Sequence, residues 1–378
     1  MIAQVAPAIT SLDDLLHRLC IGLQLSPTDY KLAVDHYEAI GRYLQAEGSP
    51  ITKHNPDIYP QGSLRIGTTV KPHGQQEYDL DLVCEMTGLD WKTCDNPVGL
   101  LDDIENWLKA NGTYEDKVER MNRCIRVNYK HKFHLDILPA CPDDETGHCC
   151  VVVPDRKLDD WKASNPRGYA DWFEGIAKTS EFEVYFKAIE PMPNQEPLEL
   201  KPPLKRAVQL IKRYRDIKLG YDSKAAISII LTTLSAENYF GQKSVNETLL
   251  GILEGIVVKL PSDGSILEVK NPKNDDEKFS ERWEADPSLY TEFKYWITEF
   301  RDEWRAVNLA SGLSTKTPHL SKLFGDDRVM KALDFQAESM NRLRSSESLG
   351  VEKTTGIITS VKSAGTLPVP KNNYYGEE

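Results

Sequence analysis

The sequence lacks any apolar run that approaches the roughly 18 residues of a membrane-spanning helix. Its first residues show no basic leader before an apolar core, so we expect no export signal. The 7 cysteines are odd in number and scattered, which is typical of reduced cytosolic thiols rather than of a disulfide framework. These absences predict a cytoplasmic protein that makes no use of a membrane.

An excess of positive charge is also absent, because the formal net charge is −12. Such an acidic surface repels long polyanions unless a basic groove compensates, so we expect no long nucleic acid as a partner. Small triphosphates differ, since a few local cations and metal ions can hold them. The length of 378 residues is enough for two compact units or one two-lobed domain.

Strand patterns dominate the first half of the chain and helical patterns the second, which predicts an α+β fold with two lobes. We expect a catalytic lobe with N-terminal helices over 1–160, a helical lobe over 161–348 and a flexible tail over 349–378. The expected strands are 77–86, 123–129, 132–138 and 149–153, with a short pair near 256–270. The expected helices are 11–24, 27–46 (capped by Ser26), 97–110, 168–189, 203–217, 224–238, 244–258, 286–308 and 327–345. The proline-containing stretch 53–61 is interpreted as a loop.

Two aspartates two residues apart, Asp79 and Asp81, lie in the strand-like run EYDLDLVCEM. Side chains at i and i+2 share one face of a strand, so the two carboxylates project together while Tyr78, Leu80 and Leu82 face a core. Asp136 has the same setting in the second run, FHLDIL. Carboxylates this close repel each other, and the oxygen donors suit Mg²⁺ or Mn²⁺ rather than zinc. The pattern predicts a metal site, whereas a bare Asp-x-Asp would more often be two solvated residues of an edge strand.

The context of the aspartates is the turn PQGSLRIGTTVKP, which ends shortly before Asp79. Gly62 permits a close approach of the backbone, and Ser63 starts a short helical turn. Backbone N–H groups at such a turn, together with a hydroxyl, can bind a phosphate. Taken alone, Gly-Ser is more often a simple turn or helix cap. Because it is followed by three aspartates on strands, the Gly-Ser turn here predicts a nucleotide-binding site.

The stretch PLKRAVQLIKRYRD places several cations on one arc of a helix, opposite an apolar stripe that contains Leu210 and Tyr214. By itself the arc is best explained as a solvated basic face. Beside the acidic triad, we expect at least one of its residues to contact a triphosphate, and Lys212 is the first candidate.

These motifs together resemble the DNA polymerase β-type nucleotidyltransferase superfamily. PDIYPQGSLRIGTTVKP and EYDLDLVCEM, with WKASNPRGYADWF, PLKRAVQLIKRYRD, AAISIILTTL and NPKNDDEKFSERW, resemble the bacterial cGAS/DncV-like nucleotidyltransferases, called CD-NTases. The resemblance spans about residues 25–345. It implies a polymerase β-like lobe with a mixed sheet, followed by a helical lobe that completes the nucleotide cleft.

The resemblance also implies an activity. Such an enzyme binds two Mg²⁺ (or Mn²⁺) ions through Asp79, Asp81 and Asp136 and makes a cyclic oligonucleotide from triphosphates with release of pyrophosphate. A purine dinucleotide such as cGAMP, made from ATP and GTP, is the expected product. Lys212 and Ser228 would hold the donor triphosphate, and Arg213 could replace Lys212. The product would activate a separate effector protein of a CBASS antiphage system, and a ubiquitin-ligase-like partner could act on the C-terminal tail.

Two alternatives remain open at this point. One is a transferase that acts on RNA, a protein or a small molecule, and the other is an inactive nucleotide sensor. A structural zinc at Cys141, His148, Cys149 and Cys150 is not favoured, because the adjacent cysteines would point to opposite faces of a strand. His134 shares a face with Asp136, but a strand histidine is more often a structural hydrogen bonder.

Overall fold

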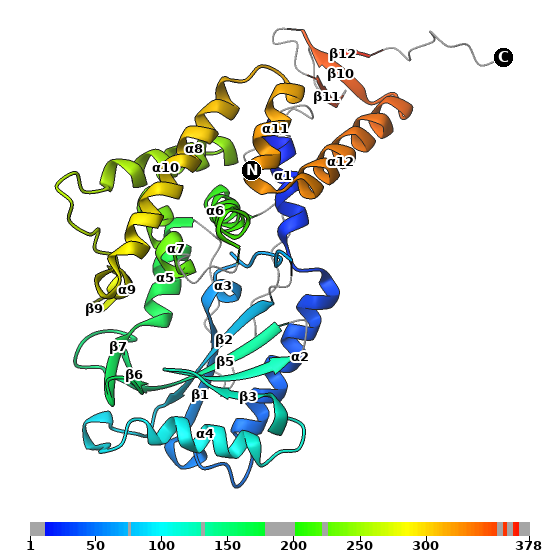
Figure 1. Cartoon of the computed structure of the whole chain (residues 1–378). Coiled ribbons are helices and arrows are strands. Elements are labelled where there is room, and N and C mark those ends of the chain that lie inside the picture. The colour runs from blue at the N-terminus through cyan, green and yellow to red at the C-terminus, as the bar shows by residue number, and fades with distance from the viewer. Residues whose placement is uncertain are drawn as a thin grey trace.

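A computed structural model describes residues 12–74, 77–129, 133–177, 201–220, 226–353, 358–360 and 366–369. The first part of the chain forms a mixed sheet of seven strands in the order β1-β2-β5-β4-β3, to which β6 and β7 are added beyond β5 (Figure 1). The strands are β1 Pro56–Gln61, β2 Tyr78–Met86, β3 Val118–Arg120, β4 Ile125–Tyr129, β5 Phe133–Pro142, β6 Val151–Asp155 and β7 Asp160–Ser164. β2 and β5 run parallel, and their neighbours are antiparallel. The expected α+β fold and mixed sheet are confirmed.

One face of the sheet is a hydrophobic core, and the opposite face carries the acidic residues. Leu80 and Leu82 of β2 are buried with Leu135 and Ile137 of β5 against helices α2 (Pro27–Leu44) and α4 (Gly99–Lys109). Because successive strand side chains alternate, Asp79, Asp81 and Asp136 must project from the other face. The side-chain alternation expected from the sequence is confirmed.

β1 corrects the interpretation of residues 53–61 as a loop. Pro56–Gln61 pairs antiparallel with β2 along its whole length, from Pro56 opposite Met86 to Gln61 opposite Asp81. β1 is the edge strand of the sheet, so its prolines can face away from the ladder, where no N–H donor is needed. The prolines are therefore compatible with a strand here.

The second part of the chain is mainly helical. Its helices are α5 Pro166–Ala177, α6 Pro203–Leu219, α7 Ser228–Glu237, α8 Val245–Lys259, α9 Glu281–Ala285, α10 Pro287–Leu309, α11 Leu313–Phe324 and α12 Asp326–Ser345. The expected helices are present, except that residues 178–189 lie outside the described part. Helices α9 and α11 were not expected. The first helix, α1 (Leu12–Leu23), packs its leucines into the core of this helical lobe rather than against the sheet, which differs from the expected boundary at residue 160.

Helix α6 lies at the centre of the molecule, between the sheet and the outer helices (Figure 1). Its polar arc is buried along with its apolar stripe, because Lys205, Gln209 and Lys212 are all less than 5% exposed. The interpretation of this arc as a solvated basic face is therefore wrong. These buried side chains instead have polar partners within the protein: Lys205 Nζ donates to Glu174 at 2.9 Å, and Gln209 Nε2 donates to the carbonyl of Thr69 at 2.7 Å.

Two regions near the C-terminus also differ from expectation. The short strand pair is β8 (Lys270–Asn271) with β9 (Asn274–Lys278), whereas residues 256–259 continue helix α8. In the segment expected as a flexible tail, β10 (Leu349–Glu352), β11 (Ile358–Ser360) and β12 (Thr366–Pro368) form a small sheet beyond α12 (Figure 1). No helix of the described residues is both long and apolar enough to cross a lipid bilayer.

Candidate functional site

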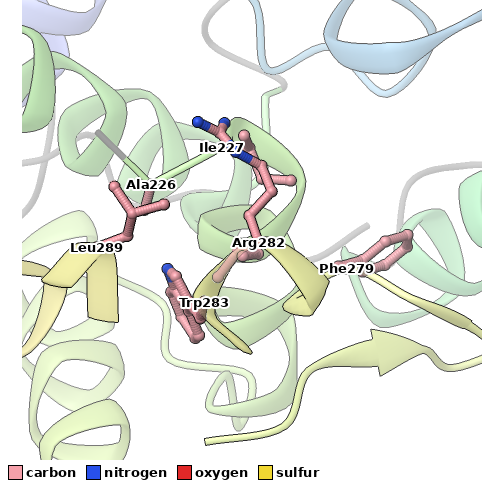
Figure 2. Close-up of a pocket in the computed structure, with 7 residues that line it drawn as sticks. Ala226, Ile227, Phe279, Arg282, Trp283 and Leu289 are labelled. Carbon is pink, nitrogen blue, oxygen red and sulfur yellow. The ribbon is translucent and has the colours of Figure 1, made fainter. Parts of the chain in front are cut away.

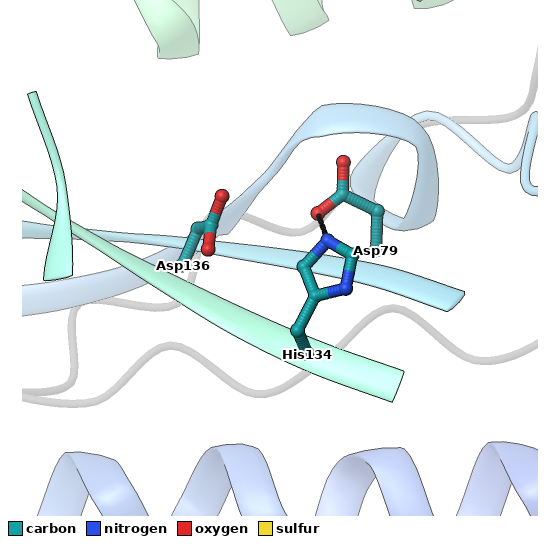
Figure 3. A group of neighbouring side chains, drawn as sticks. All are labelled: Asp79, His134 and Asp136. Carbon is teal, nitrogen blue, oxygen red and sulfur yellow. Dashed lines mark ion pairs between the residues drawn. The ribbon is translucent and has the colours of Figure 1, made fainter. Parts of the chain in front are cut away.

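The pairing of β2 with β5 brings the three aspartates together. In this parallel register Asp79 is the Cα partner of His134, and Asp81 is the partner of Asp136. Figure 3 shows Asp79, His134 and Asp136 side by side on the open face of the sheet. One ligand atom from each of these three lies within 4.8 Å of the others. The cluster therefore combines a histidine with two of the three expected carboxylates, those of Asp79 and Asp136.

Asp81 lies against the turn that precedes it in the chain. Helix α3 (Gly62–Arg65) starts at Gly62, which has a φ of 65°. A Cβ atom placed on Gly62 would lie 2.1 Å from Oδ2 of Asp81, so only glycine fits at this position. The close backbone approach expected at Gly62 is thus an approach to a carboxylate of the site.

The surroundings of Asp81 oppose the charged form of its carboxyl group. Burial raises the pKa of Asp81 well above its usual range, and the negative charges of Asp79 and Asp136 raise it further. Arg126, on the neighbouring strand β4, counteracts this rise. Its guanidinium donates two hydrogen bonds of 2.7 Å to the two oxygens of Asp136. Sequence reasoning missed Arg126, although its alternation with buried Ile125 and Val127 places it on the acidic face.

His134 contacts the most exposed of the three carboxylates. Its Nε2 lies 2.9 Å from Oδ1 of Asp79, and its Nδ1 lies 3.7 Å from a carboxylate oxygen of Glu77. Burial lowers the pKa of His134, but its hydrogen bond to Asp79 and the charge of that residue outweigh burial and leave the pKa raised.

Lys212 of α6 reaches the loop that follows the Gly-Ser turn. Its Nζ donates to Oγ1 of Thr68 at 3.0 Å and lies 3.2 Å from the carbonyl oxygen of the same residue. Ser63 Oγ lies 3.2 Å from Oγ1 of the adjacent Thr69, so Ser63 and Lys212 flank one short loop. Burial lowers the pKa of Lys212 to about 7, with a contribution from Arg215, while Asp79 and Asp81 act in the opposite direction.

The other two candidate residues on the helices, Arg213 and Ser228, contact groups outside the loop of Thr68 and Thr69. Arg213 points toward α11, where its Nε donates to the carbonyl of Phe324 at 3.2 Å. Ser228 is the first residue of α7, and its Oγ accepts a 3.0 Å hydrogen bond from Arg215. Arg215 lies near enough to Lys212 to affect its pKa. Of the two cations considered for the triphosphate, Lys212 rather than Arg213 therefore faces the acidic residues.

A small hollow lies beside the start of α7. Figure 2 shows its lining, which is apolar apart from Arg282. The lining residues are Ala226, Ile227, Ile230, Phe279, Arg282, Trp283 and Leu289. Its volume of about 10 Å³ matches a single water molecule, so it is too small for a nucleotide base.

The chain is similar to a known protein family, to curated proteins and to solved structures. Residues 11–176 match the family model of the Second Messenger Oligonucleotide or Dinucleotide Synthetase domain. The chain is 35% identical to the c-di-GMP synthase of Roseivirga ehrenbergii over 98% of both proteins. It is 27% identical to the cyclic dinucleotide synthase CdnG of Bradyrhizobium diazoefficiens, over 95% of this chain and 91% of that protein. The structure of that CD-NTase in complex with GTP superposes with a TM-score of 0.69 and 26% identity, over 86% of this chain and 98% of that one. The chain belongs to the CD-NTase family.

This CD-NTase is therefore a nucleotidyltransferase, as the sequence predicted. Its fold is also that of more distant members. The Vibrio cholerae DncV cyclic AMP-GMP synthase superposes with a TM-score of 0.56 at 16% identity, over 85% of this chain and 97% of that one. At that identity the likeness concerns the fold alone.

Proposed function

We propose that this CD-NTase joins two nucleoside triphosphates into a cyclic dinucleotide at Asp79, Asp81 and Asp136. The observation that carries the proposal is the β2–β5 register, which sets Asp81 beside Asp136 on the face of the sheet that the core leaves open. The cyclic dinucleotide synthases of Roseivirga and Bradyrhizobium support the class of product. The net charge of −12 argues against a long RNA as the acceptor.

The three carboxylates fit hard divalent cations. Oxygen donors of this kind suit Mg²⁺ or Mn²⁺, and a cation would offset the repulsion that raises the pKa of Asp81. We infer two ions per active site, which Asp79, Asp81 and Asp136 would hold. When bound, such ions would lower the pKa of the attacking ribose hydroxyl and neutralise charge on the phosphates.

The chain's own groups then position the donor nucleotide. Ser63, at the start of α3, and Lys212 flank the loop of Thr68 and Thr69, so both can reach one triphosphate. We assign them to the β- and γ-phosphates, where a cationic Lys212 stabilises the departing pyrophosphate. Ser228 and its partner Arg215 lie at the start of α7 and would extend this phosphate site.

The reaction consists of two displacements of the same kind. In the first, a ribose hydroxyl attacks the α-phosphorus of the donor, and the bond from that phosphorus to pyrophosphate breaks as the new phosphodiester bond forms. The linear intermediate keeps its own triphosphate. The intermediate must then reorient in the site, so that its free ribose hydroxyl attacks its own α-phosphorus and releases the second pyrophosphate.

A guanine-containing purine dinucleotide is the product that we favour. The c-di-GMP synthase of Roseivirga supports GTP as a substrate, and cGAMP, which requires ATP as well, is the alternative. We place the enzyme in the cytosol, in a CBASS antiphage system whose effector the product activates. A ubiquitin-ligase-like partner that acts on the C-terminal tail belongs to the same proposal.

Incubation with single ribonucleotides and with all pairs, in Mg²⁺ or Mn²⁺, followed by mass spectrometry, tests the proposal. We expect a cyclic dinucleotide and pyrophosphate, and digestion with a nuclease specific for 3′–5′ bonds identifies the linkage. The Asp136→Asn variant is the matched control and should form neither product. A tailed RNA in place of a small cyclic product, or no turnover of any nucleotide, would contradict the proposal.

A further inference from the structure

His134 lies within the carboxylate cluster without a part in the proposed chemistry. It precedes Asp136 by two residues on β5, so the two side chains share the open face of the sheet. The parallel register sets it directly beside Asp79, as it sets Asp136 beside Asp81. Figure 3 shows the imidazole turned toward the carboxylate of Asp79 and joined to it by an ion pair.

The two outer carboxylates of the cluster differ in how they are held. Asp136 is only 14% exposed and is fixed by both nitrogens of the Arg126 fork. Asp79 is 56% exposed, and among the described residues His134 is the one side chain within hydrogen-bond or ion-pair distance of it. An exposed carboxylate with a free terminal torsion rotates readily. Without its contact to His134, Asp79 would therefore sample many orientations.

We propose that His134 is a positioning residue, whose Nε2–H donates to Oδ1 of Asp79 and holds this carboxylate in the orientation that a bound divalent cation requires. This inference rests on the metal site of the proposed function. Groups that hydrogen-bond to metal ligands orient those ligands and tune the affinity for the ion. His134 thus holds the carboxylate of Asp79 in one orientation, as Arg126 holds the carboxylate of Asp136.

The positions of the two ring nitrogens argue against His134 as a ligand itself. A nitrogen that carries a proton toward Asp79 has no lone pair left for a cation. The other nitrogen faces Glu77 at 3.7 Å, on the side away from Asp79. The imidazole therefore acts through the carboxylate that it contacts.

Mn²⁺ binding to the full-length protein, measured by the loss of the free-ion electron paramagnetic resonance signal, tests this role. His134→Gln keeps an N–H donor near the position of Nε2, whereas His134→Asn is too short to reach Asp79 and His134→Leu has no donor. We expect the Kd for Mn²⁺ to rise about 10-fold or more in the Asn and Leu variants and to stay within about threefold in the Gln variant. Asn128→Leu is the matched control, because Asn128 is the β4 partner of His134 but contacts Glu119 outside the cluster.

The outcomes separate this inference from the proposed function. If wild type binds Mn²⁺ no better than Asp79→Asn, the metal site itself is wrong. If wild type binds but the Asn and Leu variants bind equally well, or if the Gln variant is as weak as they are, only the role of His134 is overturned. A strong nitrogen modulation in pulsed spectra of the wild-type Mn²⁺ complex would show direct coordination and would also overturn it. Comparison of Gln with Asn remains informative even if the Leu variant does not fold.

Discussion

Substitution of Gly62 by alanine tests the geometry of the active site with a single methyl group. The added Cβ would lie 2.1 Å from Oδ2 and 2.9 Å from Cγ of Asp81. Non-bonded atoms prefer a separation of about 3.5 Å, so the Asp81 carboxylate must retreat by more than about 1 Å. A misplacement of this size in a catalytic group costs about 100-fold in rate, equivalent to about 2.7 kcal/mol of transition-state stabilisation.

The same substitution also strains the backbone, because Gly62 has a φ of 65°. An L-residue in this region costs about 1–2 kcal/mol, which should appear as a loss of unfolding free energy. Gly264→Ala separates the two effects. Gly264 has a φ of 86° with nothing within 4 Å of the added Cβ, so it carries backbone strain without the clash.

Initial rates of pyrophosphate release, with urea denaturation of each variant, provide the assay. We expect Gly62→Ala to lose about 100-fold or more in kcat and Gly264→Ala to keep the wild-type rate, with comparable losses of stability. A Gly62→Ala enzyme within about tenfold of wild type would refute the assignment of Asp81 to the catalytic centre, because that carboxylate cannot keep its position beside an alanine.

Three further predictions concern the aspartates, Lys212 and the C-terminal segment. Asp79→Asn and Asp81→Asn should each lower turnover to less than about a tenth of wild type while the protein stays folded, as judged by circular dichroism; a higher residual rate would contradict the triad assignment. Burial lowers the pKa of Lys212 to about 7 in the free enzyme, and a bound triphosphate should raise it, so binding takes up a proton above pH 7 and affinity should fall by up to about tenfold per pH unit. Calorimetry at pH 8 in buffers of different ionisation enthalpy should detect this uptake in wild type and not in Lys212→Met, and equal uptake in both would exclude Lys212 as its source. Truncation after Ser363 removes β12, which among the described strands pairs with β10 alone, at the far end of the helical lobe, so turnover in vitro should be unchanged; a large loss of activity would place the tail in the catalytic unit.

Part of the candidate site could be predicted because its signal is local. Alternation along a strand decides which face a side chain takes, so Asp79 and Asp81 had to project together, opposite Leu80. The glycine at position 62 indicated a close approach of the backbone because it has no Cβ atom. These features depend on neighbouring residues of one segment, and the structure agrees with them at each position.

Other features depend on which segments meet, and the local pattern does not contain that information. Helical periodicity placed Lys212 and Arg213 on one polar arc, but packing of α6 at the centre of the molecule turned Lys212 toward Thr68 and Arg213 toward α11. Periodicity also suggested that the arc was solvated, whereas lobes on both sides of α6 bury it. The strand β1 was missed because its prolines are acceptable only at a sheet edge, and strand order is a property of the whole fold.

The sequence alone therefore determined the residues of the candidate site and the family: three strand aspartates, a Gly-Ser turn and the order in which they occur. The tertiary structure decided how those groups are held. Arg126 meets Asp136, and His134 meets Asp79, only because β4, β5 and β2 lie side by side in one register. A strand's own residues specify its faces, but its neighbours and their register follow from burying all the apolar faces at once, which no single segment encodes.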